Sequence, residues 1–195
     1  MSTPFIFATN NENKIIEIKS VLNEQFEIHG LKASGILVDI PEPHDTLEEN
    51  AAEKSHFIFN LTKSNCFSED TGLEVFALNG APGVKSARYA GDECDNKKNI
   101  QKLLANMAGV SERTAQFKTV ISLIIDGEEE QFTGICKGQI AHEEKGENGF
   151  GYDSIFIPDG SQLHFAEMSL EEKNKFSHRK KATMLLIDYL TKKYG

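Results

Sequence analysis

The feature that most constrains the fold is a pair of extended segments joined by the dipeptide Asp126-Gly127. The segments run from Thr114 to Ile125 and from Glu128 to Ile140, and Asp-Gly between two such runs is a strong signal for a β-hairpin. The N-terminal part instead follows a strand, turn and helix pattern, with an apolar run at 5–9 and helical spacing of apolar residues over 13–25. Both patterns in one chain predict an α/β fold with a mixed β-sheet.

Two capping boxes mark further helix starts. Thr46-Leu-Glu-Glu49 predicts a helix that runs to about Thr62, and Ser169-Leu-Glu-Glu172 marks another start. The segments 26–31 and 65–69 are predicted to be two more strands, and 79–92 is predicted to be a Gly/Pro-punctuated loop. A last helix, from about Ser177, is predicted to pack on a sheet through one stripe of residues: Ala182, Leu185, Leu186, Tyr189 and Leu190.

Composition excludes several classes of protein. The 195 residues include 21 Lys and Arg against 30 Asp and Glu, a formal charge of −9, which disfavours binding to nucleic acid because that binding depends on clustered cations. No apolar run approaches the ~20 residues that a membrane helix needs, and the N-terminus does not resemble a signal peptide. We therefore expect a cytoplasmic protein with reduced cysteines. No repeat or linker divides it, so we expect one domain over 1–195.

The turn Thr9–Lys14 lies between the first strand and the first helix. The first N–H groups of a helix have no partner inside it, and together with the helix dipole they favour a bound phosphate. Lys14 adds a positive charge in the first turn, where the dipole disfavours a cation unless an anion lies nearby. The turn predicts either a phosphate site or a solvated polar turn.

Two adjacent carboxylates, Glu69 and Asp70, end the strand at 65–69 and are followed by Thr71 and Gly72. Open α/β sheets bind ligands beyond the carboxyl ends of their strands, and carboxylate oxygens suit Mg²⁺. The alternative is a solvated acidic turn in which Gly72 supplies a positive φ. Glu42, in a proline-bracketed loop, is a third candidate ligand or an exposed loop carboxylate.

Two further segments combine glycine, aromatic and basic residues. Gly146–Asp153 is not followed by helical periodicity, which argues against a dinucleotide fingerprint. Its aromatic pair, Phe150 and Tyr152, predicts one wall of a base pocket or a plain turn with Phe150 in the core. Ser177–Lys181 opens the last helix with cations, against the dipole. This segment is either a solvated basic end or a set of donors for an anionic or carbonyl-rich ligand.

Taken together, the motifs of this chain occur in the order and at the spacings of the inosine/xanthosine triphosphate pyrophosphatases, which the chain resembles over nearly its whole length. The motifs are Thr9-Asn-x-x-x-Lys14, Ser68–Leu73, Gly80–Tyr89, Phe150–Asp153 and Ser177–Arg179. The resemblance implies a long mixed sheet flanked by helices, in two lobes around a central cleft. It also implies a homodimer that uses Mg²⁺ to hydrolyse ITP, dITP and XTP to the monophosphate and pyrophosphate.

The same resemblance implies a role for each site residue. Asp70 looks like the general base, and Glu42, Glu69 and Asp70 look like the Mg²⁺ ligands. Lys54 and Lys173 look like phosphate contacts, together with the triphosphate-binding turn: Thr9, Asn10, Asn11, Glu12, Asn13 and Lys14. Further substrate contacts are expected from Thr71 and from the base pocket: Phe150, Gly151, Tyr152, Asp153, His178 and Arg179. Arg179 is expected to donate to the C6 oxygen of the purine, which adenine lacks.

Three residues depart from the family pattern: Ser154, Lys180 and Lys85 replace a proline, a glycine and an aromatic or hydrophobic residue. None of these changes removes an expected ligand, but they leave loop geometry and base preference open. Two other functions remain as alternatives. One is a nucleotide-binding regulatory protein without catalysis, and the other is a house-cleaning pyrophosphatase for other modified nucleotides.

Overall fold

The computed structural model describes residues 3–22 and 26–194 and divides the chain into two compact units. Unit 1 consists of Met1–Asp70, Thr119–Gly134 and Arg179–Gly195, and unit 2 consists of Thr71–Lys118 and Ile135–His178. Because the segments alternate between the units, neither unit is a continuous stretch of sequence. A single functional domain over 1–195 and a central cleft stay predictions.

Seven strands form one mixed sheet in the order β2-β1-β3-β5-β6-β7, with β4 paired to β3. Strand β1 pairs in parallel with β2 and β3, whereas β4 and β7 pair antiparallel with β3 and β6. The predicted α/β class with a mixed sheet is thus confirmed. The strands are β1 (Thr3–Phe7), β2 (Phe26–Gly30), β3 (Cys66–Val75), β4 (Pro82–Gly83), β5 (Thr114–Ile125), β6 (Glu128–Ile140) and β7 (Phe156–Pro158).

The helices flank this sheet. They are α1 (Glu12–Lys19), α2 (Leu47–Thr62), α3 (Asn96–Asn106), α4 (Leu170–Lys173) and α5 (His178–Tyr194). Short 3₁₀ turns cover Phe76–Leu78, Ser86–Arg88, Asp153–Ile155 and Phe165–Glu167. The side chains of Thr46 and Ser169 cap α2 and α4 as predicted, and α2 ends at the predicted Thr62.

The hairpin prediction is also confirmed. Strands β5 and β6 are neighbours in the sheet, and only Asp126 and Gly127 separate them. Both residues have a positive φ, 55° and 84°, which is the backbone that a two-residue hairpin turn requires.

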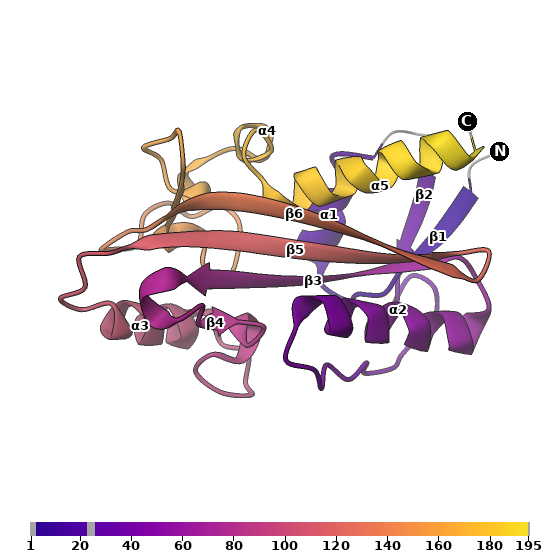
Figure 1. Cartoon of the computed structure of the whole chain (residues 1–195), viewed down its shortest axis with the longest axis horizontal. Coiled ribbons are helices and arrows are strands. Elements are labelled where there is room, and N and C mark those ends of the chain that lie inside the picture. Colours follow the sequence, from indigo (N-terminus) through magenta and orange to yellow (C-terminus); the bar gives the residue numbers. More distant parts are fainter. Residues whose placement is uncertain (1–2, 23–25, 195) are drawn as a thin grey trace. The chain divides into compact units, whose positions relative to one another are not determined.

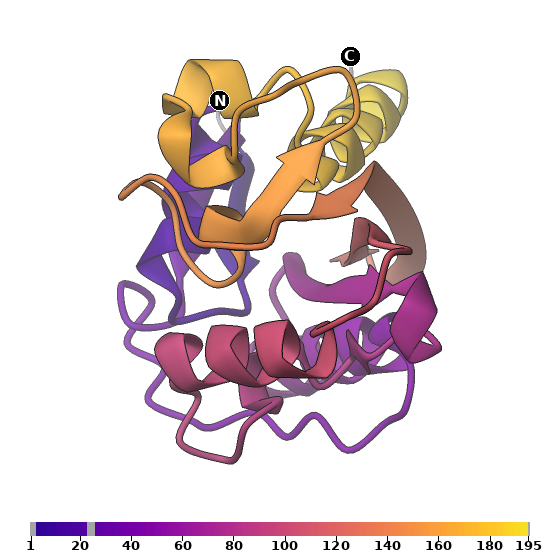
Figure 2. The ribbon, with the colours of Figure 1, turned by 90° about the vertical axis from the view of Figure 1, so that its left-hand side faces the viewer.

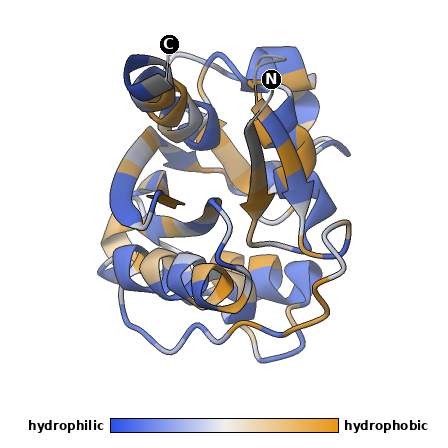
Figure 3. Cartoon of the chain, turned by 90° about the vertical axis from the view of Figure 1, so that its right-hand side faces the viewer, coloured by the Kyte–Doolittle hydropathy of each residue, from blue (hydrophilic) through white to orange (hydrophobic). Residues whose placement is uncertain are grey.

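Unit 1 has apolar cores on both faces of its strands. Helices α1 and α5 lie on one face and α2 on the other (Figure 1). Side chains of α1 and α5 pack with Phe7, Phe67 and Ile121, whereas Ile58 of α2 packs with Ile124. Hydrophobic and hydrophilic residues alternate around α2 and α5, as expected of helices with one buried face (Figure 3).

The stripe predicted for α5 needs one correction. Ala182, Leu186 and Leu190 are buried in the core, but Leu185 is 47% exposed. The three buried residues recur every four positions and stay on one side of the helix, whereas Leu185 is rotated away from them by about 100°.

Unit 2 has a core of its own. Ile100 and Leu103 of α3, with Met107 just after the helix, pack against strand and loop residues that include Phe117 and Phe156. Figure 2 shows β7 lying alongside β6. The structure leaves all three cysteines unbridged, with Cys66 and Cys136 buried and Cys94 exposed.

The first strand, predicted at 5–9, is β1 at Thr3–Phe7, and two other boundaries differ more from the sequence prediction. Helix α1 ends at Lys19, and residues 23–25 of the predicted helix lie outside the described residues. Strand β3 does not stop at Glu69 but continues to Val75. Within it, a Cβ on Gly72 would lie 2.6 Å from the carbonyl oxygen of Gly83. Gly72 is therefore needed for close approach of two strands and not for a positive φ.

Candidate active site

Strand β3 presents alternate side chains to opposite faces of the sheet in unit 1. Cys66, Ser68 and Asp70 contact α2 through hydrogen bonds. Phe67 packs with the core beneath α1 and α5, and Glu69 binds cations from those two helices. This alternation follows from the two-residue period of a strand.

The alternation corrects the predicted acidic turn. Glu69 and Asp70 were expected together at the C-terminal end of a strand, but β3 continues past both of them to Val75. Their side chains consequently point to opposite faces and join two different clusters of charges. Glu69 is therefore separated from the pair formed by Asp70 and Glu42.

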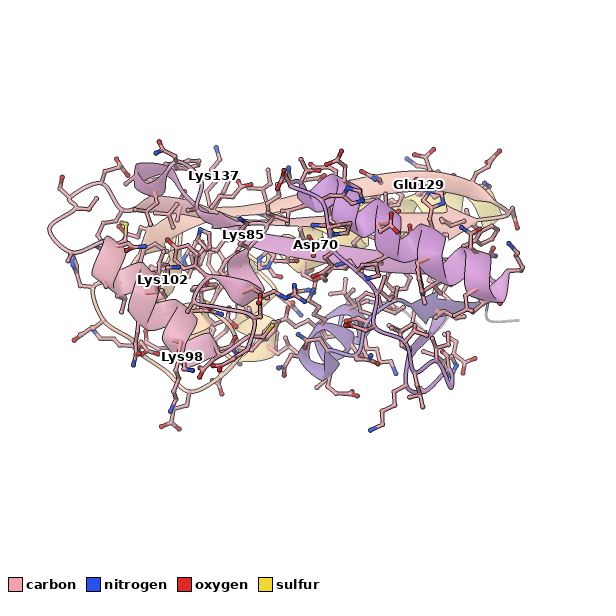
Figure 4. The ribbon with its side chains drawn as sticks, turned by 90° about the horizontal axis from the view of Figure 1, so that it is seen from below. Asp70, Lys85, Lys98, Lys102, Glu129 and Lys137 are labelled. Atoms are coloured by element: carbon pink, nitrogen blue, oxygen red, sulfur yellow. The ribbon has the colours of Figure 1, made fainter. Side chains whose placement is uncertain are left out.

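The first cluster is centred on Lys54 of α2. The Lys54 Nζ donates to Glu42 Oε1 at 2.6 Å and to Asp70 Oδ1 at 2.8 Å. Lys54 is 5% exposed and Asp70 is 7% exposed. Figure 4 shows Asp70 on β3 beside α2. Two carboxylates that are far apart in sequence thus converge on one buried ammonium.

Burial and neighbouring charges set the protonation of this cluster. Burial raises the pKa of the Asp70 carboxyl, although the charges of Lys54 and Lys14 oppose the rise. Burial alone would lower the pKa of Lys54, but the attraction of Asp70 and Glu42 outweighs it, and the pKa is raised. Lys54 therefore stays charged, and Asp70 is a stronger base than an exposed aspartate.

The loop that carries Glu42 is held by the buried side chain of Asn50. Its Oδ1 accepts from the His44 N–H at 2.9 Å, and its Nδ2 donates to the His44 carbonyl at 3.1 Å. Asn50 lies one turn before Lys54 on α2. The same helix therefore supplies the ammonium and fixes the loop that brings Glu42 to it.

The second cluster lies on the other face of β3. The Arg179 guanidinium donates from Nε and Nη2 to both oxygens of Glu69, with an Nη2 to Oε1 distance of 2.8 Å, and from Nη1 to Glu17. The Lys14 Nζ also lies 3.0 Å from Glu69 Oε1. Burial alone would raise the pKa of Glu69, but Arg179 and Lys14 hold it well below its ordinary value. Glu69 is therefore an anion at neutral pH and lies between two cations.

This cluster gives a different account of the basic start of α5. The sequence left open whether its cations are solvated or await a ligand. Arg179 is 2% exposed, and Glu17 and Glu69 neutralise it. Protein carboxylates therefore compensate this cation at the helix N-terminus.

The turn Thr9–Lys14 caps itself. The Asn11 side chain accepts from the N–H groups of Asn13 and Lys14, and the Thr9 hydroxyl accepts from the Asn11 N–H. The expectation of unpaired N–H groups at these positions is wrong, because Asn11 is the N-cap residue of α1. Exposed polar side chains remain on the turn, contributed by Asn10, Asn11, Glu12 and Asn13.

Unit 2 holds the predicted base-pocket segment. The Lys173 Nζ donates to Asp153 Oδ2 at 2.6 Å and lies 5.4 Å from the ring centre of Phe150. The same Asp153 oxygen accepts from the Phe150 N–H at 2.9 Å. A Cβ on Gly149 would lie 2.1 Å from that oxygen. Lys173, expected at the phosphates, thus packs with residues expected at the base.

The aromatic residues of this segment differ in exposure. Phe150 is half-buried, whereas Tyr152 is 4% exposed and donates its hydroxyl to the Ser86 carbonyl at 2.8 Å. His178 stacks on Phe117, with ring centres 4.6 Å apart. Of the two rings proposed to stack on a base, Tyr152 belongs to the core of unit 2, and Phe150 is the accessible one.

Comparison with known proteins identifies the family. A model of the Ham1 family matches residues 5–189. The chain belongs to the Ham1 family. It is 50% identical to the dITP/XTP pyrophosphatase of Christiangramia forsetii over 96% of this chain and 98% of the relative. The corresponding protein of Porphyromonas gingivalis is 49% identical over 95% of this chain and 96% of the relative.

Solved Ham1-family structures have the same fold. The Staphylococcus aureus Ham1 protein superposes with a TM-score of 0.88 at 39% identity, covering 97% of this chain and 99% of that chain. The Coxiella burnetii HAM1 protein gives a TM-score of 0.89 at 35% identity, covering 98% and 100%. None of the helices in the described part of this Ham1-family chain has the length and hydropathy of a membrane span.

The sequence analysis of this Ham1-family chain missed Glu17. It lies in α1 three residues after Lys14, is 7% exposed, and binds Arg179. The available signal was a glutamate between Ile15 and Ile18 on the apolar side of the helix. A charge in that position needs a buried partner.

Proposed function

We propose that this chain hydrolyses the non-canonical purine nucleoside triphosphates ITP, dITP and XTP to the monophosphate and pyrophosphate. The observation that carries the proposal is the pair of buried clusters on the two faces of β3. They combine lysines for phosphate binding with a carboxylate of raised pKa, in a family whose similar members are named dITP/XTP pyrophosphatases.

The chemistry needs charge neutralisation and a positioned water more than covalent catalysis. Lys14, at the start of α1, and Lys54 are the proposed phosphate contacts, together with the turn that begins at Thr9. Asp70 is the proposed general base, because burial raises its pKa and so makes it a better proton acceptor than an exposed aspartate.

Mg²⁺ is the proposed cofactor. No group of three or more His, Cys, Asp or Glu side chains suited to a metal occurs within residues 3–22 and 26–194. The donor set of Glu42 and Asp70 still fits a hard cation, because two carboxylates already converge on one positive charge. Bound there, Mg²⁺ would neutralise phosphate charge. Glu69 fits this role less well, because Arg179 and Lys14 occupy its oxygens.

Base recognition is proposed for unit 2. Phe150, Gly151, Tyr152 and Asp153, with His178, remain the proposed base pocket. Lys173 remains a proposed phosphate contact, and Thr71 is a further proposed substrate contact. A donor that faces the C6 oxygen of hypoxanthine or xanthine would face a donor on adenine, and such a mismatch discriminates by roughly 10⁴-fold or more. The contacts of Arg179 with Glu17 and Glu69 favour a positioning role for that residue.

The test is pyrophosphate release with Mg²⁺ over a panel of ITP, dITP, XTP, GTP, ATP and dUTP. We expect turnover of ITP, dITP and XTP to be well above that of ATP and dUTP. Binding of ITP without turnover would instead identify a regulatory nucleotide-binding protein. Preference for a modified pyrimidine would identify a different house-cleaning pyrophosphatase.

A homodimer that acts in the cytoplasm is part of the same proposal, on the basis of the family resemblance. Sedimentation equilibrium measures the assembly directly. A mass twice the 21.7 kDa of the chain supports the dimer, and the mass of one chain contradicts it.

A further inference from the structure

We propose that the Lys54 ammonium is an internal cation that holds the place of a divalent metal ion between Glu42 and Asp70, so that metal binding and triphosphate binding are coupled through the release of this lysine. The inference rests on the proposed function, which supplies the two ligands. It adds a competition between a residue of this chain and the metal ion.

The geometry sets up the competition. One ammonium lies 2.6 Å from Glu42 Oε1 and 2.8 Å from Asp70 Oδ1, and the Asp70 and Lys54 side chains are buried. A divalent ion that used these oxygens would meet the positive charge of Lys54 within a few ångströms. Repulsion at that distance is strong where water is scarce. The carboxylates therefore cannot serve both cations well at once.

Only the side chain of Lys54 needs to move. The backbone of α2 is tied to β3 on both sides of Lys54, since Ser68 donates to the Ala51 carbonyl and Cys66 to the Ser55 carbonyl. Lysine has a flexible four-carbon stem, and its ammonium binds phosphate as a point charge. A triphosphate thus offers the displaced ammonium a new partner.

The coupling follows from this exchange. Without a triphosphate, a metal ion must displace Lys54 and leave the ammonium buried without a carboxylate. With a triphosphate, the ammonium gains phosphate oxygens and the carboxylates become available. Each ligand then raises the affinity for the other by the same factor, as linkage requires.

The experiment measures metal affinity of the full chain without any nucleotide. Mn²⁺ is titrated calorimetrically into the unsubstituted protein, into Lys54→Met, and into Lys97→Met as a control. Lys97 is exposed on α3, so its variant makes the same change in net charge elsewhere. We expect Lys54→Met to bind Mn²⁺ about tenfold more tightly than the unsubstituted protein, a size typical of coupling between sites. Lys97→Met should match the unsubstituted protein.

Further variants locate the effect. Lys54→Gln serves where Lys54→Met does not fold by circular dichroism, and Lys54→Arg should keep the weak metal binding because it keeps the charge. Adding Asp70→Asn to Lys54→Met should abolish the gain in Mn²⁺ affinity. Equal or weaker Mn²⁺ binding by the folded neutral variant, or a gain that survives Asp70→Asn, overturns the proposal.

These titrations contain no substrate. A failure of the proposed function would be seen separately, as absent pyrophosphate release, and so would not be confused with a failure of the competition between Lys54 and the metal ion.

Discussion

Asp70 combines a buried carboxylate, a lysine partner and a raised pKa at one position of β3. Asp70→Asn preserves the volume but removes the negative charge that would bind a metal ion or accept a proton. We expect turnover of ITP to fall by at least ~10²-fold, the scale of a lost acid–base contribution. The measurement is kcat at saturating Mg²⁺. Asp92→Asn, at an exposed position, is the control, and near-normal kcat of Asp70→Asn would remove Asp70 from both roles.

Arg179 illustrates how contacts change an expectation drawn from sequence. A guanidinium at the purine predicts that Arg179→Ala lowers kcat/KM for ITP and XTP more than for ATP. With Arg179 bound to Glu17 and Glu69, we expect an equal loss for all three nucleotides. Loss of Arg179 would misplace Glu69 and Lys14, and a displacement of about 1 Å can lower the reaction rate roughly 10²-fold.

The replacement Arg179→Lys should recover little activity, because an ammonium cannot bind Glu69 with a planar fork. Ratios of kcat/KM for ITP, XTP and ATP decide between the two expectations. A loss of kcat/KM that is larger for ITP and XTP than for ATP would show that Arg179 contacts the purine base.

At the scale of single elements, helix α2 carries Lys54 and the Asn50 clamp on the Glu42 loop. The Thr46 hydroxyl caps its first turn by accepting from the Glu49 N–H at 3.2 Å. Thr46→Ala should lower the free energy of unfolding by about 1 kcal/mol, as is typical for a lost N-cap. Urea denaturation measures this change. Ser64→Ala, just after the helix, is the matched control, and equal stabilities of the two variants would contradict the cap.

Elements with strong local signals were predictable from the sequence, and those set by distant contacts were not. The Asp126-Gly127 turn and the caps at Thr46 and Ser169 depend on neighbouring residues alone. The continuation of β3 through Gly72 depends instead on close approach to Gly83. The sequence likewise indicated that Glu69 and Asp70 belong to the functional site. It did not indicate that their side chains lie on opposite faces of the sheet, because that depends on the continuation of β3.

For the molecule as a whole, Glu69 ties stability to pH. Its pKa is well below the ordinary value of 4.5 in the folded protein, so the unfolded chain binds its proton more readily. The stabilisation is fully present above pH 4.5 and is lost as the pH falls toward the folded-state pKa. The Glu69 carboxylate should therefore contribute strongly to the free energy of unfolding at neutral pH and little in strong acid.

Glu69→Gln isolates this contribution. It leaves Arg179 and Lys14 without their shared anion, and breaking such a buried pair costs about 3–5 kcal/mol at pH 7. The difference in unfolding free energy from the unsubstituted protein should shrink as the pH falls below 4.5, measured by urea denaturation at several pH values. Glu130→Gln, at an exposed position, is the control. A difference that does not vary with pH would show that Glu69 is not the ionised partner.

The alternation of side chains along β3 also makes the length of this strand intolerant of change. Deleting one residue between Cys66 and Glu69 would shift the following acids by one position and exchange their faces. Glu69 would then turn toward the lysine of α2, and Asp70 toward the arginine of α5. An insertion or deletion here would change the partners in both charge clusters at once without altering the identity of a single site residue.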